Sequence, residues 1–232
     1  MKIIPNISVD CVVFGYNGNG VDVLLIKQKA TSENLESQYA LPGNLVGVEE
    51  DLDDAAERVL KDLTQLEGIY LKQFKTFGNP SRVTNPKDRA WLNDVREFPN
   101  ERVITVAYYS LVSEEDYEPV PSEFAATTEW VPLKNVPPLA FDHDEILRQA
   151  VATLKNELIT EHIGFELLPK KFTLSQLQEL HEIILDKKLD KRNFRKSMKK
   201  MNRLVALDEK QKGVDHKPAQ LFQYDPETEL GE

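Results

Sequence analysis

The stretch Leu41–Leu66 constrains the fold more than any other, because it combines a strand end, a tight turn and one amphipathic helix. After an acidic turn, its apolar residues recur at the spacing that places them on one helical face. The members of this face are Leu52, Ala55, Ala56, Val59, Leu60 and Leu63. We expect a helix over residues 51–65, with acidic residues near its start, where they suit the helix dipole. An acidic loop and helix of this kind could hold Mg²⁺ and a phosphate ester.

The residues around this stretch predict an α+β body over residues 1–160. Two β-branched runs, Ile7–Phe14 and Val21–Lys27, are joined by an Asn-Gly turn that is typical of a hairpin. The other expected elements are strands at Tyr39–Leu41, Ile69–Phe77, Arg102–Val112 and Thr128–Leu133, and a helix at Asp144–Ile159. The segment Gly78–Glu101 is expected to be an irregular loop, and long loops are usually functional or partly disordered. Its cations allow two interpretations, a basic rim for an anionic ligand or a solvated insertion.

The charge distribution divides the chain into an acidic body and a basic module. The net charge is −10, yet Ile163–Gln220 holds 14 Lys and Arg against 8 Asp and Glu, and the remainder holds 15 against 31. We therefore expect a second domain over residues 161–232. The single cysteine, Cys11, excludes an internal disulfide, and its apolar neighbours favour a buried, inert thiol. Without a membrane-length apolar run or a secretory signal, the expected location is the cytoplasm.

The order of elements in the second domain is that of a winged helix-turn-helix. Thr173 opens a helix through a capping box with Gln176. Asp190 is the expected N-cap of a second helix, Lys191–Arg203. Two short strands, Val205–Leu207 and Gln220–Tyr224, surround a basic loop and complete the pattern. This order of elements predicts binding to double-stranded DNA.

The second helix supplies the candidate DNA contacts. Lys187–Arg203 contains nine Lys and Arg and one acidic residue, while its apolar residues keep helical spacing, so the cations share one surface. A solvated charged face is the alternative interpretation. Base edges are the expected targets of Arg192, Asn193 and Lys196, since Arg suits guanine and Asn suits adenine. The expected phosphate contacts are Lys191, Arg195, Lys199 and Lys200 from the helix and Lys210, Lys212 and Lys217 from the wing.

In outline the body resembles the Nudix hydrolase family, whose box reads G-x5-E-x7-R-E-U-x-E-E-x-G-U, with U apolar. In that frame Glu50 matches the first Glu, Arg58 matches the Arg, and the apolar slots are kept at Leu60 and Leu66. The other positions depart from the pattern, with Asn44 and Gln65 in place of Gly and with Val59, Asp62 and Leu63 in place of Glu. The resemblance implies a retained scaffold without the carboxylates that bind the metal, and no metal or cofactor is expected.

Other interpretations of the acidic helix remain open. Asp54, Glu57, Arg58 and Asp62 also fit an exposed row of i, i+4 charge pairs, each contributing only about 0.2–0.5 kcal/mol. A working metal site would use Glu50, Asp62 and Glu57 with Mg²⁺, which would make the chain a Mg-dependent Nudix hydrolase of a nucleoside diphosphate derivative such as ADP-ribose. A metal-free ligand contact through Glu50 or Arg58 is the third interpretation.

Both halves together resemble the Nudix-related transcriptional regulators of bacteria. The matching pieces are the degenerate box, GNPSR, LAFDH and the run GFELLPKKFTLSQLQELHEIILDKKLDKRNFRK. The resemblance implies a Nudix-like α/β/α sandwich that senses a small molecule without hydrolysing it, a winged-helix reader and a homodimer. Family effectors are either ADP-ribose and related NAD metabolites or sugars, and the long segment Val83–Asn100 leaves the choice open. The candidate ligand contacts are Lys27, Glu50, Arg58, Asn79, Arg82, Arg102 and His143, although His143 is equally interpretable as a packing residue.

Overall fold

The computed structural model describes residues 6–28, 38–95, 101–121, 125–160, 164–201, 203–213 and 217–225. The chain forms two compact units, which divide between Leu154 and Lys155, with Gly18–Gly20 counted with the second. None of the helices in the described ranges is long and apolar enough to cross a membrane.

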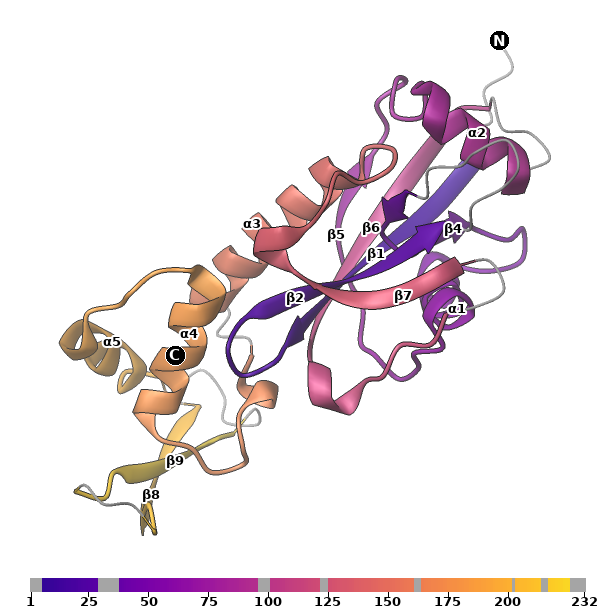
Figure 1. Cartoon of the computed structure of the whole chain (residues 1–232). Helices are drawn as coiled ribbons and strands as arrows, with labels where there is room; N and C mark the ends of the chain where they lie inside the picture. Colours follow the sequence, from indigo (N-terminus) through magenta and orange to yellow (C-terminus); the bar gives the residue numbers. More distant parts are fainter. Residues whose placement is uncertain are drawn as a thin grey trace. The chain divides into compact units, whose positions relative to one another are not determined.

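The first unit is built on a mixed sheet in which β1 and β6 are central (Figure 1). Its strands are β1 (Asn6–Tyr16), β2 (Val21–Gln28), β3 (Tyr39–Ala40), β4 (Gly43–Leu45), β5 (Lys72–Phe77), β6 (Val103–Ser113) and β7 (Ala125–Pro132). β1 and β6 pair in parallel from Asn6–Val103 to Tyr16–Ser113. Most residues of both strands are buried, as expected for parallel strands that are covered on both faces.

The sheet divides into two branches beside β1, and this division positions the candidate site. β1 pairs with β2 only from Phe14–Val23 to Tyr16–Val21. Towards its start β1 pairs with β4 instead, while β2 pairs with β3 and β7. Where β1 and β2 no longer pair with one another, the residues between the two branches can line a cavity.

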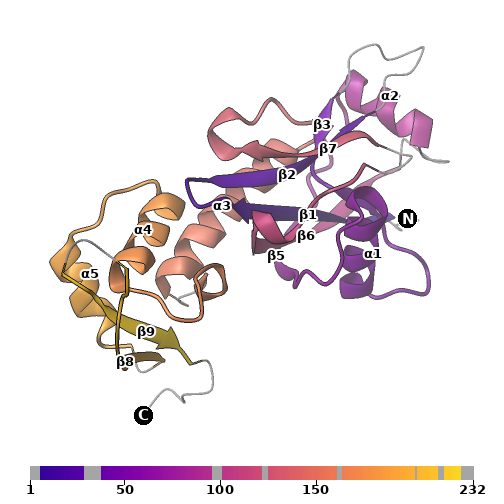
Figure 2. The ribbon, with the colours of Figure 1, turned by 60° about the horizontal axis from the view of Figure 1, so that its bottom comes forward.

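Three helices complete the first unit: α1 (Leu52–Thr64), α2 (Pro86–Val95) and α3 (His143–Thr160). α1 and α3 lie on opposite sides of the central strands, and α2 lies at one end of the sheet (Figures 1 and 2). The apolar face of α1 predicted from its spacing packs into a core with Val9, Cys11 and Val13 of β1. The carboxylate of Asp51 accepts hydrogen bonds from the backbone N–H groups of Asp53 and Asp54, both at 3.0 Å, and caps this helix.

The second unit contains α4 (Leu174–Leu185), α5 (Lys191–Met198) and a hairpin of β8 (Leu204–Lys210) and β9 (Gln220–Tyr224). Short 3-10 turns occur in the chain at Glu114–Asp116, Leu133–Asn135 and Phe165–Leu167. The capping box between Thr173 and Gln176 is present, as predicted. The core of this unit is an apolar cluster that its helices and β9 share: Phe165, Phe172, Leu174, Leu177, Phe194, Met198 and Phe222.

Two sequence predictions about these elements were wrong. Gly78–Glu101 is not wholly irregular, because Asn85 accepts a hydrogen bond from the N–H of Lys87 and Pro86 opens α2. Residues 96–100 of that segment lie outside the described ranges. The basic helix ends at Met198 rather than Arg203, because the N–H groups of Lys200, Met201 and Leu204 bond to the carbonyls three residues before them, and these turns lead the chain into β8 at Leu204.

Candidate functional site

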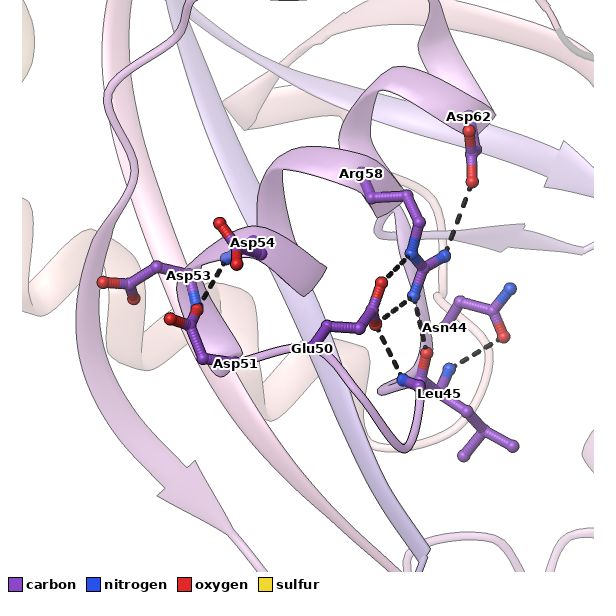
Figure 3. Close-up of polar contacts among 9 residues, drawn as sticks. Asn44, Leu45, Glu50, Asp51, Asp53, Asp54, Arg58 and Asp62 are labelled. Carbon is purple, nitrogen blue, oxygen red and sulfur yellow. Dashed lines mark hydrogen bonds and ion pairs between the residues drawn. The ribbon is translucent and has the colours of Figure 1, made fainter.

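Glu50 and Arg58 form a clasp between the acidic loop and α1 (Figure 3). The Arg58 Nε and Nη2 atoms lie 2.5 and 2.8 Å from the two carboxylate oxygens of Glu50. Arg58 also donates to the Leu45 carbonyl at 3.0 Å, and Glu50 accepts from the Gly47 N–H at 2.7 Å. Hydrogen bonds from Arg58 and Gly47 lower the pKa of Glu50 to about 2. Glu50 is therefore charged, and its carboxylate is already engaged in the hydrogen bonds that hold the loop.

The carboxylates around this clasp do not fit a divalent metal site. Val59 is fully buried and Leu63 is 7% exposed, so two box positions contribute core side chains instead of ligands. The Asp62 carboxylate lies 3.4 Å from Arg58, and the Asp53 carboxylate accepts a hydrogen bond from the Tyr108 hydroxyl at 2.6 Å. Among the residues placed by the structure, no group of three His, Cys, Asp or Glu could hold a metal ion. Mg²⁺ beside a phosphate needs several free oxygen ligands, which this set does not offer.

The helix end supports the alignment of the box. Gln65, at the position of the Gly in the box, adopts the left-handed conformation with φ 61° and follows the last residue of α1. Glycine is preferred there because it lacks the Cβ that makes this conformation costly. The left-handed backbone conformation at this position of the box is therefore kept, although Gln65 replaces the usual Gly.

A cavity of about 310 Å³ lies where the sheet divides. One branch contributes Ser8, Asp10 and Gly43, and the other contributes Ile26 and Ala40. The remaining lining comes from α1, the loop before α2, α2, β6, the residues just before α3 and its first residue: Leu63, Arg82, Val83, Trp91, Leu92, Val103, Phe141 and His143. Asn44 of β4 and Leu41, between β3 and β4, complete the lining. Leu63, which stands where the box has a Glu, makes part of this wall apolar.

Arg82 is the centre of a buried ion network at this cavity. Its Nε and Nη2 atoms donate to the two oxygens of Asp142 at 2.9 and 2.7 Å, and Nη2 also reaches Asp10 at 3.3 Å. The side chains of Arg82 and Asp10 are 4% and 6% exposed. Burial alone would raise the pKa of Asp10, but His143, Arg82 and Thr105 hold it well below its usual range. The carboxylate of Asp10 is therefore charged whenever the protein is folded near neutral pH.

His143 completes the network. Its Nδ1 atom accepts the N–H of Leu41 at 3.0 Å, and its Nε2 atom lies 3.4 Å from Asp10. Gly43 makes this arrangement possible, because a Cβ on Gly43 would lie 1.9 Å from an oxygen of Asp10. The Pro-Gly turn of the sequence is thus a close-approach site for a buried carboxylate.

Two aromatic side chains of the cavity wall lie beside the ion network. The rings of Trp91 and Phe141 have centroids 5.3 Å apart, and the Phe141 and His143 rings have centroids 5.2 Å apart. Phe141 has φ 59°, which for a bulky residue costs about 1–2 kcal/mol. Strain of this kind persists only where the surroundings impose it, and it is concentrated at functional sites.

The predicted ligand contacts separate into two groups. Arg82 and His143 line the cavity. The others do not line it and make contacts elsewhere. Glu50 and Arg58 bind one another, and the Lys27 ammonium lies over the Tyr39 ring at 5.1 Å from its centroid. Asn79 accepts hydrogen bonds from the N–H and hydroxyl of Ser81, and Arg102 donates to the Gly78 carbonyl at 3.0 Å. The Asn79 turn explains GNPSR, since the Arg82 N–H bonds to the Asn79 carbonyl and the turn directs Arg82 inward.

Sequence reasoning missed Asp10, Asp142, Trp91 and Phe141. A usable signal existed for Asp10, because a carboxylate inside the apolar strand VDCVVF has to find a cation or a hydrogen-bond donor. No local pattern identified Arg82 as that cation, because 72 residues separate it from Asp10.

In the second unit, the turn before α5 is fixed by Glu182. Its carboxylate accepts from the Lys188 ammonium at 2.7 Å and from the Leu189 N–H at 3.0 Å. These contacts, with a hydrogen bond from Gln178, lower the pKa of Glu182 to about 2. Asp190 then caps α5 by accepting the N–H of Asn193 at 2.8 Å. The turn that leads into the cationic helix is therefore fastened to α4.

The predicted DNA contacts lie on the solvent side of α5 and on the wing. Phe194 and Met198 are buried, while Lys191, Arg192, Asn193, Lys196, Lys199 and Lys200 are exposed. A groove of about 880 Å³ runs between the start of α4, α5 and β9, and six predicted contacts line it: Lys191, Arg192, Arg195, Lys196, Lys199 and Lys217. Arg195 is half-buried and donates to the Ser175 hydroxyl at 3.4 Å. Lys210 ends β8, and Lys212 follows it in the wing loop.

Known families match both units of the chain. Residues 5–152 match the NUDIX domain, and residues 164–224 match the NrtR DNA-binding winged helix domain. The ADPR responsive transcriptional repressor NtrR of Acinetobacter baylyi is 31% identical over 224 residues, covering 95% of this chain and 82% of that protein.

Solved structures agree with these matches. Shewanella oneidensis NrtR complexed with a 27mer DNA is 27% identical, with a TM-score of 0.70 over 96% of this chain and 94% of that one. The NUDIX domain of the same protein complexed with ADP ribose is 26% identical, with a TM-score of 0.52 over 66% of this chain and 90% of that one. A MutT/nudix family protein from Enterococcus faecalis shares the fold at 22% identity, with a TM-score of 0.73 over 97% of this chain and 88% of that one. The chain therefore belongs to the family of transcriptional regulators that join a NUDIX domain to an NrtR-type DNA-binding winged helix domain.

Proposed function

We propose that this chain is a bacterial transcriptional regulator that binds operator DNA through its second unit and a small-molecule effector through its first. The observation that carries the proposal is the exposed cationic face of α5, whose opposite face is buried and whose turn is fastened by Glu182. Exposed like charges at i, i+4 spacing are mutually unfavourable, and a DNA backbone would offset that cost.

The position of each polar residue on the second unit suggests whether it contacts bases or phosphates of the DNA. Arg192, Asn193 and Lys196 lie on the exposed side of α5 and read base edges in the major groove. The other predicted contacts bind phosphates: Lys191 and Arg195 from α5, Lys199 and Lys200 from the turn that follows it, and Lys210, Lys212 and Lys217 from the wing. The half-buried Arg195, held by Ser175, suits a fixed phosphate contact.

The proposed effector is ADP-ribose or a related NAD metabolite, and its site is the cavity at the division of the sheet. The A. baylyi relative is named as responsive to ADPR, and the S. oneidensis NUDIX domain was solved with ADP ribose, which supports this choice over a sugar. Arg82 and His143 are the proposed cavity contacts. For Lys27, Glu50, Arg58, Asn79 and Arg102, contact with the effector stays a prediction that alanine substitution and calorimetry would test.

The ion network offers a route from effector to DNA. Arg82 lies in the cavity wall and bonds Asp142, which directly precedes α3. α3 is one continuous helix whose residues from Lys155 onward belong to the second unit. A ligand that displaced Arg82 would therefore change the anchorage of a helix shared by both units.

We further propose that the chain regulates without hydrolysing its effector. In the alternative, which the resemblance of the first unit to Nudix hydrolases suggests, Glu50 and Asp62 support Mg-dependent cleavage of a nucleoside diphosphate derivative. The clasp on Glu50 and the apolar residues at positions 59 and 63 oppose this alternative. Incubation with ADP-ribose and Mg²⁺ decides between them, since release of AMP above a protein-free control would establish the hydrolase.

The remaining parts of the proposal concern organisation. We propose a Nudix-like domain over residues 1–160, a DNA-binding domain over residues 161–232, a homodimer in solution and a cytoplasmic location. Two half-sites on duplex DNA suit a two-fold symmetric reader. Sedimentation velocity at micromolar concentration tests the dimer, and a monomer at all concentrations would refute it.

Fluorescence anisotropy with labelled DNA from the promoter region of its own gene tests the central proposal. We expect sequence-preferring binding that weakens steeply with salt and changes on addition of ADP-ribose. Equal, weak binding to this DNA and to a scrambled duplex, with and without ADP-ribose, would refute the regulator.

A further inference from the structure

We propose that Lys171 and Glu209 are positioning residues for DNA binding, because their ion pair directs the wing so that its cations reach phosphates of the duplex. The wing is the hairpin of β8 and β9 (Figure 2), and the cations concerned are Lys210 and Lys212. This inference rests on the proposed function, since it takes the second unit to bind DNA. It goes further by giving a role in that binding to two residues that act through others.

The ladder between β8 and β9 does not by itself fix the course of β8. Ala206 pairs with Phe222. The next pair along the hairpin joins Lys210 to Gln220, so residues 207–209 of β8 stand opposite a single residue of β9. An irregularity of this kind interrupts the ladder, bends the strand and re-aims the side chains beside it. Contacts outside the ladder must therefore hold β8 at this point.

The ion pair between Lys171 and Glu209 is such a contact. The Lys171 Nζ atom lies 2.7 and 2.8 Å from the two carboxylate oxygens of Glu209. Lys171 directly precedes Phe172, whose N–H and carbonyl bond to Phe222 of β9 at 3.0 and 2.8 Å. β9 therefore lies between this segment and β8, and the ion pair crosses it, spanning two strand spacings, or roughly 9–10 Å.

The segment that carries Lys171 is a firm anchor for this contact. Phe172 is buried, and Phe165 stacks on Tyr224 at the end of β9 with ring centroids 4.2 Å apart and 2° between the ring planes. Both phenylalanines belong to the apolar core of the second unit. The ion pair thus ties an exposed, irregular part of β8 to backbone that the core holds in place.

The charge of Glu209 supports a positioning role. Glu209 directly precedes Lys210 on the wing, and a carboxylate beside cations that meet DNA repels phosphates. The Lys171 and Glu209 side chains are 49% and 52% exposed, and an exposed ion pair contributes little to stability. A carboxylate of the wrong sign for DNA, which adds little to the fold, suits this place because it directs the strand that carries Lys210.

Glu209→Gln separates positioning from charge. Loss of a negative charge beside DNA would by itself strengthen binding. We expect weaker binding instead, by about 5-fold at about 0.15 M salt, and a slope of log affinity against log salt lower by about 0.9, for each phosphate that the wing no longer reaches. If both Lys210 and Lys212 lose their phosphates, the loss is about 30-fold and the slope falls by about 1.8. Fluorescence anisotropy of the full-length protein with operator and scrambled duplexes measures both quantities.

Asp208→Asn is the matched control for this substitution. Asp208 is exposed and lies in the same irregular part of β8, so its replacement removes the same charge from the same stretch. We expect Asp208→Asn to keep the wild-type slope and to bind DNA at least as tightly as wild type.

An exchange of the two charges tests whether Lys171 itself touches DNA. Lys171→Gln should weaken binding and lower the slope, as Glu209→Gln does, whereas Lys170→Gln at the exposed neighbouring residue should keep the wild-type slope. The double substitution Lys171→Glu with Glu209→Lys keeps the net charge and the ion pair, and it should restore the slope. Thermal melting should be nearly unchanged in every variant, since the ion pair is exposed.

The outcomes separate this inference from the proposed function. If Glu209→Gln binds DNA as tightly as Asp208→Asn with an unchanged slope, the inference is overturned and the regulator stands. If the charge exchange leaves the slope as low as in Lys171→Gln, Lys171 contacts a phosphate directly and the inference is also overturned. If wild type binds operator and scrambled duplexes equally, the regulator is refuted. The slopes on the scrambled duplex then still decide the role of the ion pair, because phosphate contacts do not depend on sequence.

Discussion

Asp142→Asn tests the ion network in isolation. The substitution keeps nearly the same side-chain volume, and asparagine is as well suited as aspartate to the position before a helix. It removes the charge that Arg82 contacts at 2.9 and 2.7 Å, with side chains 4% and 18% exposed. Asp144→Asn is the matched control in the same helical turn, because Asp144 is exposed and its carboxylate accepts the Leu139 N–H at 3.2 Å.

The structure sets the size of the two effects. Breaking a buried ion pair by removing one partner costs about 3–5 kcal/mol. Asp142→Asn should cost less, about 2–3 kcal/mol, because one oxygen acceptor remains and Asp10 still binds Arg82. For a domain of this size that corresponds to a melting temperature lower by roughly 5–10 °C. Asp144→Asn removes only a carboxylate near a helix start, worth about 0.3–1 kcal/mol.

Urea unfolding followed by circular dichroism measures both variants. Equal destabilisation by the two substitutions would refute the network as a stabilising element of the first unit. The same pair tests the route to DNA, since the ratio of DNA dissociation constants with and without ADP-ribose should approach one in Asp142→Asn and remain at the wild-type value in Asp144→Asn. If ADP-ribose leaves the DNA dissociation constant of the wild-type protein unchanged, the result would instead count against ADP-ribose as the effector.

Three other substitutions test separate features. Gly43→Ala should destabilise the first unit by about 1–3 kcal/mol in urea unfolding, because its Cβ would lie 1.9 Å from the Asp10 carboxylate, and an unchanged midpoint would contradict the close approach. Gln65→Gly should stabilise it by about 0.5–1 kcal/mol, because glycine relieves the left-handed residue after α1, and a loss of stability would argue against strain there. Lys199→Ala should lower the slope of log affinity against log salt by about 0.9 for operator and scrambled DNA alike, whereas a sequence-selective loss would place Lys199 at a base.

The sequence was most informative where structure depends on neighbouring residues. The spacing of apolar residues placed α1 within one residue of its observed ends, and Thr173 and Asp190 were identified correctly as caps. β9 was predicted with its observed bounds. For α1 and the two caps, the hydrogen bonds and the apolar face involve residues within a few positions of one another, so the local pattern determines the element. The partners of β9 lie farther away, in β8 and at Phe172.

The sequence was least informative where residues meet across the fold. Arg82 and Asp142 are 60 residues apart, and neither lies in a pattern that requires the other. α2 was missed because the whole segment Gly78–Glu101 was expected to be an irregular loop, although Asn85 and Pro86 supply an N-cap and a favourable first helical residue. The end of α5 was placed too late, because its cationic spacing continues past Met198 while the backbone turns towards the wing.

The clasp between Glu50 and Arg58 has a practical consequence for enzyme engineering. The loop before α1 is held in shape by these two residues, whatever chemistry occurs beside it. A designer who wished to install phosphohydrolase activity would therefore not rebuild the loop, but would introduce glutamates at positions 59, 62 and 63. Two of those positions now belong to the core, so each new carboxylate would have to be matched by an apolar substitution that restores the lost packing.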